Sequence, residues 1–433
     1  MEIKLSRMDE EKFSNNLTKF LNHIDSIKET LPFSVVLFAA FSQKAKIELN
    51  EFIDKKTDKI TKEDGKEAFK VKLADQKVYE ALQSNAVVSS LAGKVISSSL
   101  FVSLISQYDA YLNRLLRYIF KLKPEILNGS EKRLVFSQLM EFGTIEKARE
   151  YIIEKEVETV LRKNHSEHFD YLENKLGIEL RKNLPAWSTF IEITERRNLL
   201  VHCDGVISNQ YVAICTEHKC LPQKAKVGQT LTVSVDYFFQ AYECLYEISS
   251  KLTHTLWRKL IPEELEEADE SLNGICYDLI QAKSYDLSAI MLDFAVKQRK
   301  HSDEHNKNIF IVNAALCQFL KGELEEAKKI MMSKDWSSAS DIFKLANSIL
   351  VGDNSNAFKL MLKIGSDGDV KKDQYQQWPL FLKLREEKKF KETYNEIFKE
   401  EFKIIEIPDR PLAKMSIKGK ENKSTKDKAV LKK

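Results

Sequence analysis

Apolar residues recur at helical spacing through most of the 433-residue chain. The strongest stripe lies within 86–122, where large apolar side chains three or four residues apart predict one long amphipathic helix. The stripe consists of Phe101, Leu104, Ile105, Tyr108, Leu112, Leu115, Leu116 and Ile119. Pro124 and the Asn128-Gly129 pair that follows predict the end of this helix.

Weaker patterns predict the rest of the N-terminal half. Amphipathic spacing predicts helices over 10–30, 131–141, 144–162, 166–175, 187–203 and 236–260. The apolar run 31–41 contains Pro32 and fits either a helix or a buried strand. Residues 50–75 are rich in Lys and Asp and predict an exposed connection or a loose hairpin. The β-prone residues of 206–235 are interrupted by turn residues and predict a short two-stranded excursion.

Paired helices are predicted from 265 to 400. Three loosely similar units, over 313–331, 346–363 and 378–398, each place an apolar segment before an amphipathic one. Such spacing is typical of an α-helical repeat domain, and it resembles tetratricopeptide repeats in the small residues and the Gly turn. An ordinary helical bundle is the alternative. Residues 401–433 predict a flexible basic tail.

Composition supports a mostly helical fold. Only 13 Gly and 8 Pro are present, too few for the many turns of a β-sandwich or barrel and for a Gly-rich Rossmann loop. The net charge of +3 is unevenly distributed, because the tail from Arg410 to Lys433 carries +7 and the remainder therefore about −4. Charge alone thus does not mark the body of the chain as a nucleic-acid binder.

The cysteine pattern and the N-terminus favour a soluble cytoplasmic protein. Six scattered cysteines form no disulfide framework and are expected to be reduced. The N-terminus lacks the apolar region of a signal peptide, and no uninterrupted apolar window predicts a membrane-spanning helix.

Cofactor motifs are absent from the sequence. It contains no Walker loop, no G-x-G-x-x-G, no H-E-x-x-H and no G-x-S-x-G. The C-x-x-H-x-C spacing of Cys215, His218 and Cys220 matches no common zinc site, so we predict neither a metal nor a cofactor. His165 and His168 lie on a charged helix, where we expect solvated side chains.

The segment 195–205 carries the candidate chemistry. On an ideal helix, Asn198 lies about 40° and Glu195 about 20° from His202, so the three form one polar ridge. Arg197 lies about 140° from His202, so a disrupted last turn at Asp204-Gly205 would be needed to bring the two together. A histidine and an arginine suit RNA cleavage, in which the 2′-hydroxyl of the substrate is the nucleophile. A structural histidine at a polar helix end is the alternative.

Asp109 adds a carboxylate to the apolar stripe of 86–122. An unpaired charge there would be costly, so Asp109 is expected to pair with Arg197 or Arg196. Such a pair fits a core salt bridge and an oriented active-site arginine equally well.

These parts together resemble the HEPN superfamily (higher eukaryotes and prokaryotes nucleotide-binding), in particular its abortive-infection and toxin-type members. The helix FVSLISQYDAYLNRLLRYIF and the later ITERRNLLVHCDGVISNQYV carry the resemblance, which covers about residues 90–255. Arg197-Asn198 followed by His202 matches the family's R-N-x-x-x-H form. We therefore predict an N-terminal helical extension over 1–90, a HEPN-like domain over 91–260, and the helical-repeat domain over 265–400.

The resemblance implies a metal-independent endoribonuclease that acts as a homodimer in phage defence or as a toxin. His202 would be the acid/base, Arg197 the phosphate stabiliser and Asn198 a supporting residue, with Asp109 and Glu195 beside them. The products would be a 2′,3′-cyclic phosphate and a 5′-hydroxyl. A local cleft of arginines is expected to contact phosphates of an RNA, for example a tRNA. Those arginines are Arg114, Arg117, Arg162, Arg196 and Arg197.

A non-catalytic scaffold is the competing hypothesis. In that case the bundle dimerises, the region 265–400 binds a protein partner such as an antitoxin, and Arg197 and His202 are structural. An enzyme should leave His202 accessible, whereas a scaffold has no such requirement.

Overall fold

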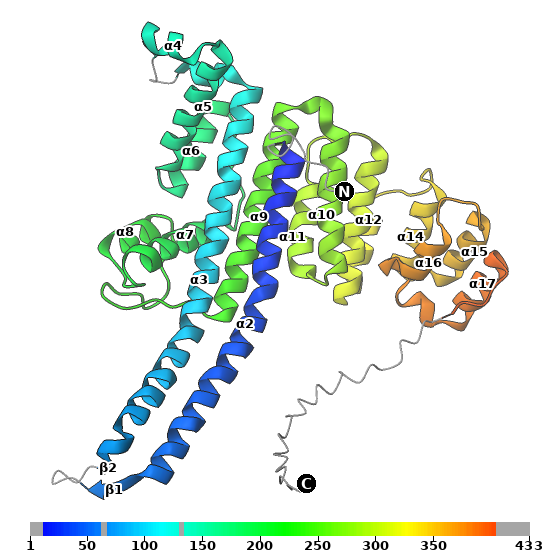
Figure 1. Ribbon diagram of the computed structural model, residues 1–433. Helices are drawn as coiled ribbons and strands as arrows, with labels where there is room; N and C mark the ends of the chain where they lie inside the picture. The colour runs from blue at the N-terminus through cyan, green and yellow to red at the C-terminus, as the bar shows by residue number, and fades with distance from the viewer. Residues whose placement is uncertain (1–11, 62–66, 130–133, 404–433) are drawn as a thin grey trace, which may run out of the picture. The chain divides into compact units, whose positions relative to one another are not determined.

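The computed structural model describes residues 12–61, 67–129 and 134–403. The chain divides into two compact units, 1–334 and 335–433. In the described ranges nearly every element is a helix, and the single sheet has two strands (Figure 1). This confirms the mostly helical fold class.

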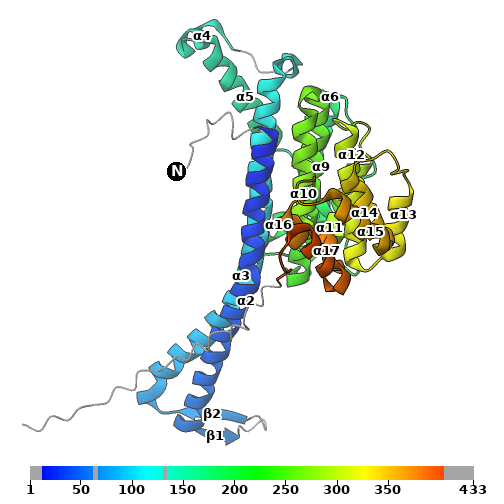
Figure 2. The same ribbon diagram turned by 90° about the vertical axis from the view of Figure 1, so that its right-hand side faces the viewer.

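Two long helices form an antiparallel hairpin in the first unit. Helix α2 (Phe13–Lys56) and helix α3 (Gln76–Leu122) lie side by side in both views (Figures 1 and 2). Strands β1 (Thr57–Thr61) and β2 (Glu67–Val71) pair antiparallel between them, with Thr57 opposite Val71. The run 31–41 is therefore helical, with Pro32 inside α2, and the hairpin expected within 50–75 is present.

The apolar stripe of α3 forms the centre of the first core. All eight of its predicted side chains are buried. The first turns of α2 pack on them, and Phe20 lies 6.2 Å from the ring centroid of Tyr108. Phe13 stacks on Trp257 of helix α9 (Val235–Leu260), with ring centroids 5.9 Å apart. Helical spacing therefore identified this core correctly.

The remaining elements of the first unit follow α3. They are η2 (Pro124–Gly129), α4 (Phe136–Phe142), α5 (Ile145–Leu161), α6 (His165–Leu176), α7 (Trp187–His202), α8 (Asn209–Glu217), α9, η3 (Pro262–Glu264), α10 (Leu265–Gln281), α11 (Tyr285–Val296), α12 (Glu304–Lys321) and α13 (Leu324–Met332). Local signals set their ends: Asn164 caps α6 through the backbone N–H of Glu167, and Gly177 ends it in the left-handed conformation. The helices predicted over 144–162, 166–175, 187–203 and 236–260 are confirmed. Helix α4 overlaps the one predicted over 131–141, whose first residues lie outside the described residues.

The strand excursion predicted over 206–235 is only partly present. An isolated antiparallel bridge joins Val206 to Thr230, and backbone hydrogen bonds join Ile207 to Gln229 and Gly205 to Leu231. Between these ends the segment is not a strand, because helix α8 occupies 209–217. Ser208 caps α8 by accepting a hydrogen bond from the backbone N–H of Tyr211. Tyr211 and Cys215, one helical turn apart, are both buried in a small cluster with Leu199 of α7. Packing at that spacing outweighs the β propensity of the segment.

The second unit contains four helices and two 3-10 turns in its described residues. They are α14 (Asp341–Val351), α15 (Asn354–Ile364), α16 (Lys372–Gln377), η4 (Pro379–Phe381), η5 (Leu384–Glu386) and α17 (Lys388–Phe398). Helix pairs occur where the first two repeat units were predicted, as α12–α13 and α14–α15. The first half of the third unit is wrong, because Pro379 opens a short 3-10 turn there. The tail 404–433 lies outside the described residues.

The predicted borders at 90 and 260–265 fall within the first unit. Helix α3 runs without interruption through position 90. Helices α9 and α10 share one core, which contains Trp257, Ile261, Ala268 and Leu272. The extension 1–90 and the beginning of 265–400 therefore pack in the same unit as the segment that resembles HEPN.

One described segment, 73–122, is apolar and long enough to cross a membrane by length and composition alone. We expected none. A mostly buried core helix of a soluble protein meets the same criterion, but 24% of the apolar window of this segment is buried. The structure is compatible with a soluble protein.

Candidate functional site

Helix α7 ends at the last residue of the candidate motif, just before the stop that Asp204-Gly205 predicted. Its last residue is His202, and both Asp204 (φ 49°) and Gly205 (φ 77°) are left-handed. The backbone N–H of Gly205 donates to the carbonyl of Leu199 at 3.0 Å, which closes the helix end. A Cβ at Gly205 would lie 2.6 Å from the carbonyl oxygen of Leu231, so this close approach requires glycine.

Arg197 is held in place by two neighbours. Its Nη2 lies 2.5 Å from Oδ2 of Asp109 on α3, which is the ion pair expected from the sequence. Its Nη1 donates to Oδ1 of Asn198 at 3.1 Å, and the amide of Asn198 reaches Glu195 at 3.4 Å. The Nε of Arg197 is buried and has no hydrogen-bond partner among the described residues. The bonds to Asp109 and Asn198 use two of the five N–H donors of the guanidinium.

His165 and His168 are not solvated, contrary to expectation. Their exposed fractions are 7% and 2%. His165 Nε2 lies 2.9 Å from the second carboxylate oxygen of Asp109, so Asp109 bridges α6 and α7. Burial and the nearby His165 lower the pKa of His168 to about 4, which makes His168 neutral at pH 7. His165 packs on Tyr108 of α3 and Phe190 of α7, and His168 packs against His165.

A pocket of about 620 Å³ brings the sequence-predicted residues together. Its lining comes from α3, the α5–α6 turn and α6, and α7 with the start of α8. The polar lining residues relevant to chemistry are Asp109, Arg162, Lys163, His165, His168, Glu195, Arg197, Asn198 and His202. His202 is exposed, whereas burial raises the pKa of Glu195 against the opposing effects of His165 and Asn198. Arg197 and His202 both line this pocket, although α7 is helical through His202 and the disrupted last turn expected from the sequence is absent before that residue.

The expected arginine cleft is mostly wrong. Of its five members only Arg162 and Arg197 line the pocket. Arg114 donates to Asn16, and Arg117 pairs with Glu150. Arg196 is buried on another face of α7, where it belongs to a separate network.

That network links α7 to α8 and α9. Arg196 pairs with Glu192, with 2.7 Å between its Nη2 and the carboxylate, and its guanidinium lies 3.8 Å from the ring centroid of Tyr237. Tyr211 donates to the same carboxylate at 2.5 Å, and Tyr237 also donates to it. Neither the tyrosines nor Glu192 was singled out from the sequence, because only the fold brings them to Arg196. The network fixes the helix that carries Arg197 and His202.

The arrangement offers an accessible imidazole, an oriented guanidinium and further cations. Such a set can move a proton and stabilise a phosphate oxyanion. Within the described ranges, no three His, Cys, Asp or Glu side chains lie close enough to share a metal ion. Comparisons of the chain with models of protein families, with curated proteins and with solved structures find no match.

Proposed function

We propose that this protein is an endoribonuclease that cleaves RNA through attack of the 2′-hydroxyl on the adjacent phosphorus. One observation carries the proposal: the accessible His202 and the clamped Arg197 line the same pocket of about 620 Å³. The nucleophile belongs to the RNA, so the reaction needs an acid/base and a phosphate stabiliser but no protein nucleophile and no metal. The resemblance of 193–212 to the R-N-x-x-x-H form supports the same activity.

His202 is the proposed acid/base. Its imidazole would accept the 2′-hydroxyl proton as the 2′-oxygen bonds to phosphorus, and the bond from phosphorus to the 5′-oxygen would break. The departing 5′-oxygen takes up a proton, which leaves a 2′,3′-cyclic phosphate and a 5′-hydroxyl. His168 is a poor donor for that proton, because its pKa of about 4 leaves it neutral near pH 7.

Arg197 is the proposed phosphate stabiliser. The carboxylate of Asp109 and the amide of Asn198 fix two arms of its guanidinium, so little rotamer entropy is lost when a phosphate arrives. These two bonds use one N–H on each terminal nitrogen, so a second N–H on each remains to donate to a non-bridging oxygen. Lys163 in the pocket lining adds positive charge for the flanking phosphates, whereas Arg162 pairs with Glu158. Glu195 supports Asn198.

We further propose that the protein works as a cytoplasmic homodimer in phage defence or as a toxin, as the resemblance implies. The RNA target, for example a tRNA, and an antitoxin or other partner at the helical-repeat region belong to the same proposal.

The α2–α3 hairpin provides a surface for the second copy. Eight large apolar side chains at one level of the hairpin are between 40% and 73% exposed. This arm band consists of Phe33, Val36, Leu37, Phe41, Val87, Val88, Leu91 and Val95. Phe38 of α2 faces Gly93 of α3, which sets the two halves of the band at the same level, and Phe41 and Val88 line one hollow between the helices.

The size of the arm band favours a second copy over a bilayer. At about 150–200 Å² per large side chain its exposed area is roughly 800 Å², which is what one partner of a standard interface contributes. The uncharged run 31–43 is about 20 Å long, short of the roughly 30 Å hydrocarbon core of a membrane. Lys44 and Glu29 bound it at either end.

The test is RNA cleavage with EDTA present, on total RNA and on tRNA. We expect the wild-type chain to cleave RNA and to leave cyclic phosphate ends, and we expect His202→Ala to abolish cleavage with an almost unchanged melting temperature. His305→Ala removes another exposed histidine, outside the pocket, and should retain activity. Intact RNA with the wild-type chain would favour the non-catalytic scaffold, and equal cleavage by His202→Ala would show that His202 is not the acid/base.

A further inference from the structure

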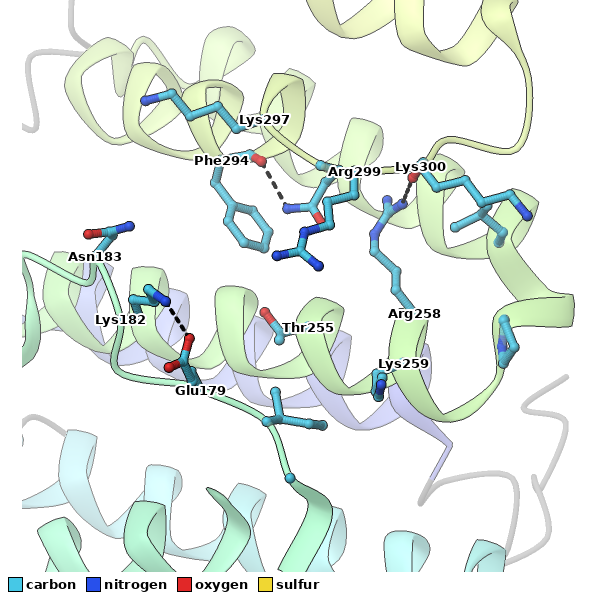
Figure 3. A pocket seen from close by; sticks show the side chains of 15 residues that line it. Glu179, Lys182, Asn183, Thr255, Arg258, Lys259, Phe294, Lys297, Arg299 and Lys300 are labelled. Carbon is cyan, nitrogen blue, oxygen red and sulfur yellow. Dashed lines mark hydrogen bonds and ion pairs between the residues drawn. The ribbon is translucent and has the colours of Figure 1, made fainter. Parts of the chain in front are cut away.

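A basic groove lies elsewhere on the first unit. A hollow of about 740 Å³ is enclosed by the segment 177–183, the C-terminal half of α9, and residues 294–300 at the end of α11 and in the loop after it (Figure 3). A second hollow of about 430 Å³ shares residues of all three walls, among them Asn183, Thr255 and Phe294, so the two form one continuous groove along α9. None of the residues of the His202 pocket lines it.

Positive charge is concentrated in this groove. Its charged lining residues are Lys182, Arg258, Lys259, Lys297, Arg299, Lys300 and one acid, Glu179. Glu179, Asp269 and Asp293 pair with three of the cations. Lys259, Arg299 and Lys300 form no ion pair with any described residue. Like charges repel at such close range, so three unpaired cations in a body of about −4 net charge favour an anionic ligand.

A buried carboxylate holds the basic loop in place. Asp269 is fully buried and accepts hydrogen bonds from Arg258 Nη2 at 2.6 Å and from the backbone N–H of Ser302 at 2.7 Å. Arg258 Nη1 in turn donates to the carbonyl of Lys300 at 3.3 Å. The Nε of Arg258 is buried without a partner among the described residues, on a side chain that is 9% exposed. These hydrogen bonds fix the backbone of the loop at Lys300 and Ser302 before any ligand binds.

The remaining lining residues of the larger hollow are uncharged. Phe294, Leu265 and Ile178 supply apolar surface, and Phe294 lies beside Arg299 across from Thr255 (Figure 3). Thr255 and Asn183 add a hydroxyl and an amide that can bond to a sugar or a base. The volume lies in the range of roughly 300–1,000 Å³ that small ligands fill.

We propose that this groove binds a nucleotide that carries two or more phosphates. The phosphates lie against Lys259, Arg299 and Lys300, whose charge and planar donors match phosphate oxygens, and the base lies against Phe294. The inference does not rest on the proposed ribonuclease activity, because it uses a different set of residues.

The test is binding of ATP, ADP, AMP and inorganic pyrophosphate to the full chain by calorimetry, with a single-stranded RNA oligomer for comparison. We expect affinity to rise with phosphate number, and ATP to bind more tightly than pyrophosphate because the base adds contact. The triple variant Lys259→Glu, Arg299→Glu, Lys300→Glu should weaken ATP binding by about ten-fold or more. A charge-matched triple variant at exposed lysines outside the groove, Lys307→Glu, Lys359→Glu, Lys391→Glu, should bind ATP as the wild type does.

Three results would overturn the proposal. One is the absence of binding by any of these nucleotides at millimolar concentration with the fold intact. Another is equal loss of binding in both triple variants, which would indicate attraction by overall charge. The third is RNA binding that ATP does not displace and that the groove variant abolishes, which would make the groove a polynucleotide surface.

Discussion

Asp109 couples two side chains of the candidate site. Its carboxylate contacts both Arg197 and His165 and is 32% exposed. Asp109→Ala should lower the free energy of unfolding by roughly 1–3 kcal/mol, because both partners lose their acceptor. Asp109→Asn should cost less stability but should reduce RNA cleavage, since Arg197 is no longer held by charge. Urea denaturation and a cleavage assay measure the two effects, with Ser106→Ala on an exposed part of α3 as the control. An unchanged free energy in Asp109→Ala would contradict the clamp.

His254 makes the first core sensitive to acid. It is fully buried on α9, and burial followed by the nearby Arg258 lowers its pKa from 6.5 to about 3. The unfolded chain therefore binds this proton at a higher pH than the folded chain does. The contribution of His254 to the free energy of unfolding is therefore fully present above pH 6.5. It is lost as the pH decreases from 6.5 toward 3, by up to about 1.4 kcal/mol per pH unit.

Replacement of His254 isolates that contribution. Between pH 7 and pH 5, His254→Phe should lose about 2 kcal/mol less unfolding free energy than the wild type. Chemical denaturation at the two pH values gives this difference directly. His305→Phe, at an exposed position, should follow the wild-type pH dependence. The same pH dependence in His254→Phe and the wild type would show that His254 is not the acid-sensitive group.

At the scale of elements, the end of α7 positions His202. Gly205 combines a positive φ with a carbonyl oxygen that would lie 2.6 Å from an added Cβ. Gly205→Ala should therefore destabilise the protein by more than about 1 kcal/mol and reduce cleavage, because the helix end and the segment at Leu231 must separate. Gly228→Ala is the matched control: its φ is also positive, but no atom lies within 4 Å of the added Cβ. Thermal melts should rank Gly205→Ala below Gly228→Ala, and the reverse order would refute the close approach.

At the scale of the whole molecule, the arm band predicts self-association. The double variant Leu37→Glu, Leu91→Glu places two charges in the band without touching the core around Phe20 and Tyr108. We expect the wild type to be a dimer by light scattering and the variant to be a monomer that retains its melting temperature. Leu382→Glu, at another exposed leucine, should remain dimeric. A monomeric wild type that binds lipid vesicles through the band would instead identify a membrane contact.

The periodicity of the chain determined the helices and most of their ends. The stripe of α3 was predictable because spacing of three and four residues is a local property, and Pro124 and Gly205 are stop signals that act over a few residues. The same helical spacing placed Asp109 within the apolar stripe, so the sequence predicted that its carboxylate forms an ion pair. Of the two candidate arginines, only the fold selected Arg197.

Contacts between distant segments decided the rest. The inward positions of His165 and His168 depend on α3 and α7, which the sequence of α6 does not contain. The helical state of 209–217 depends on burial of Tyr211 and Cys215 beside Leu199, which overrides local β propensity. The basic groove is assembled from the three separate segments 177–183, 255–265 and 294–300, so no local pattern marks it. Local propensity thus determined the elements, whereas burial and charge pairing across the fold determined the sites.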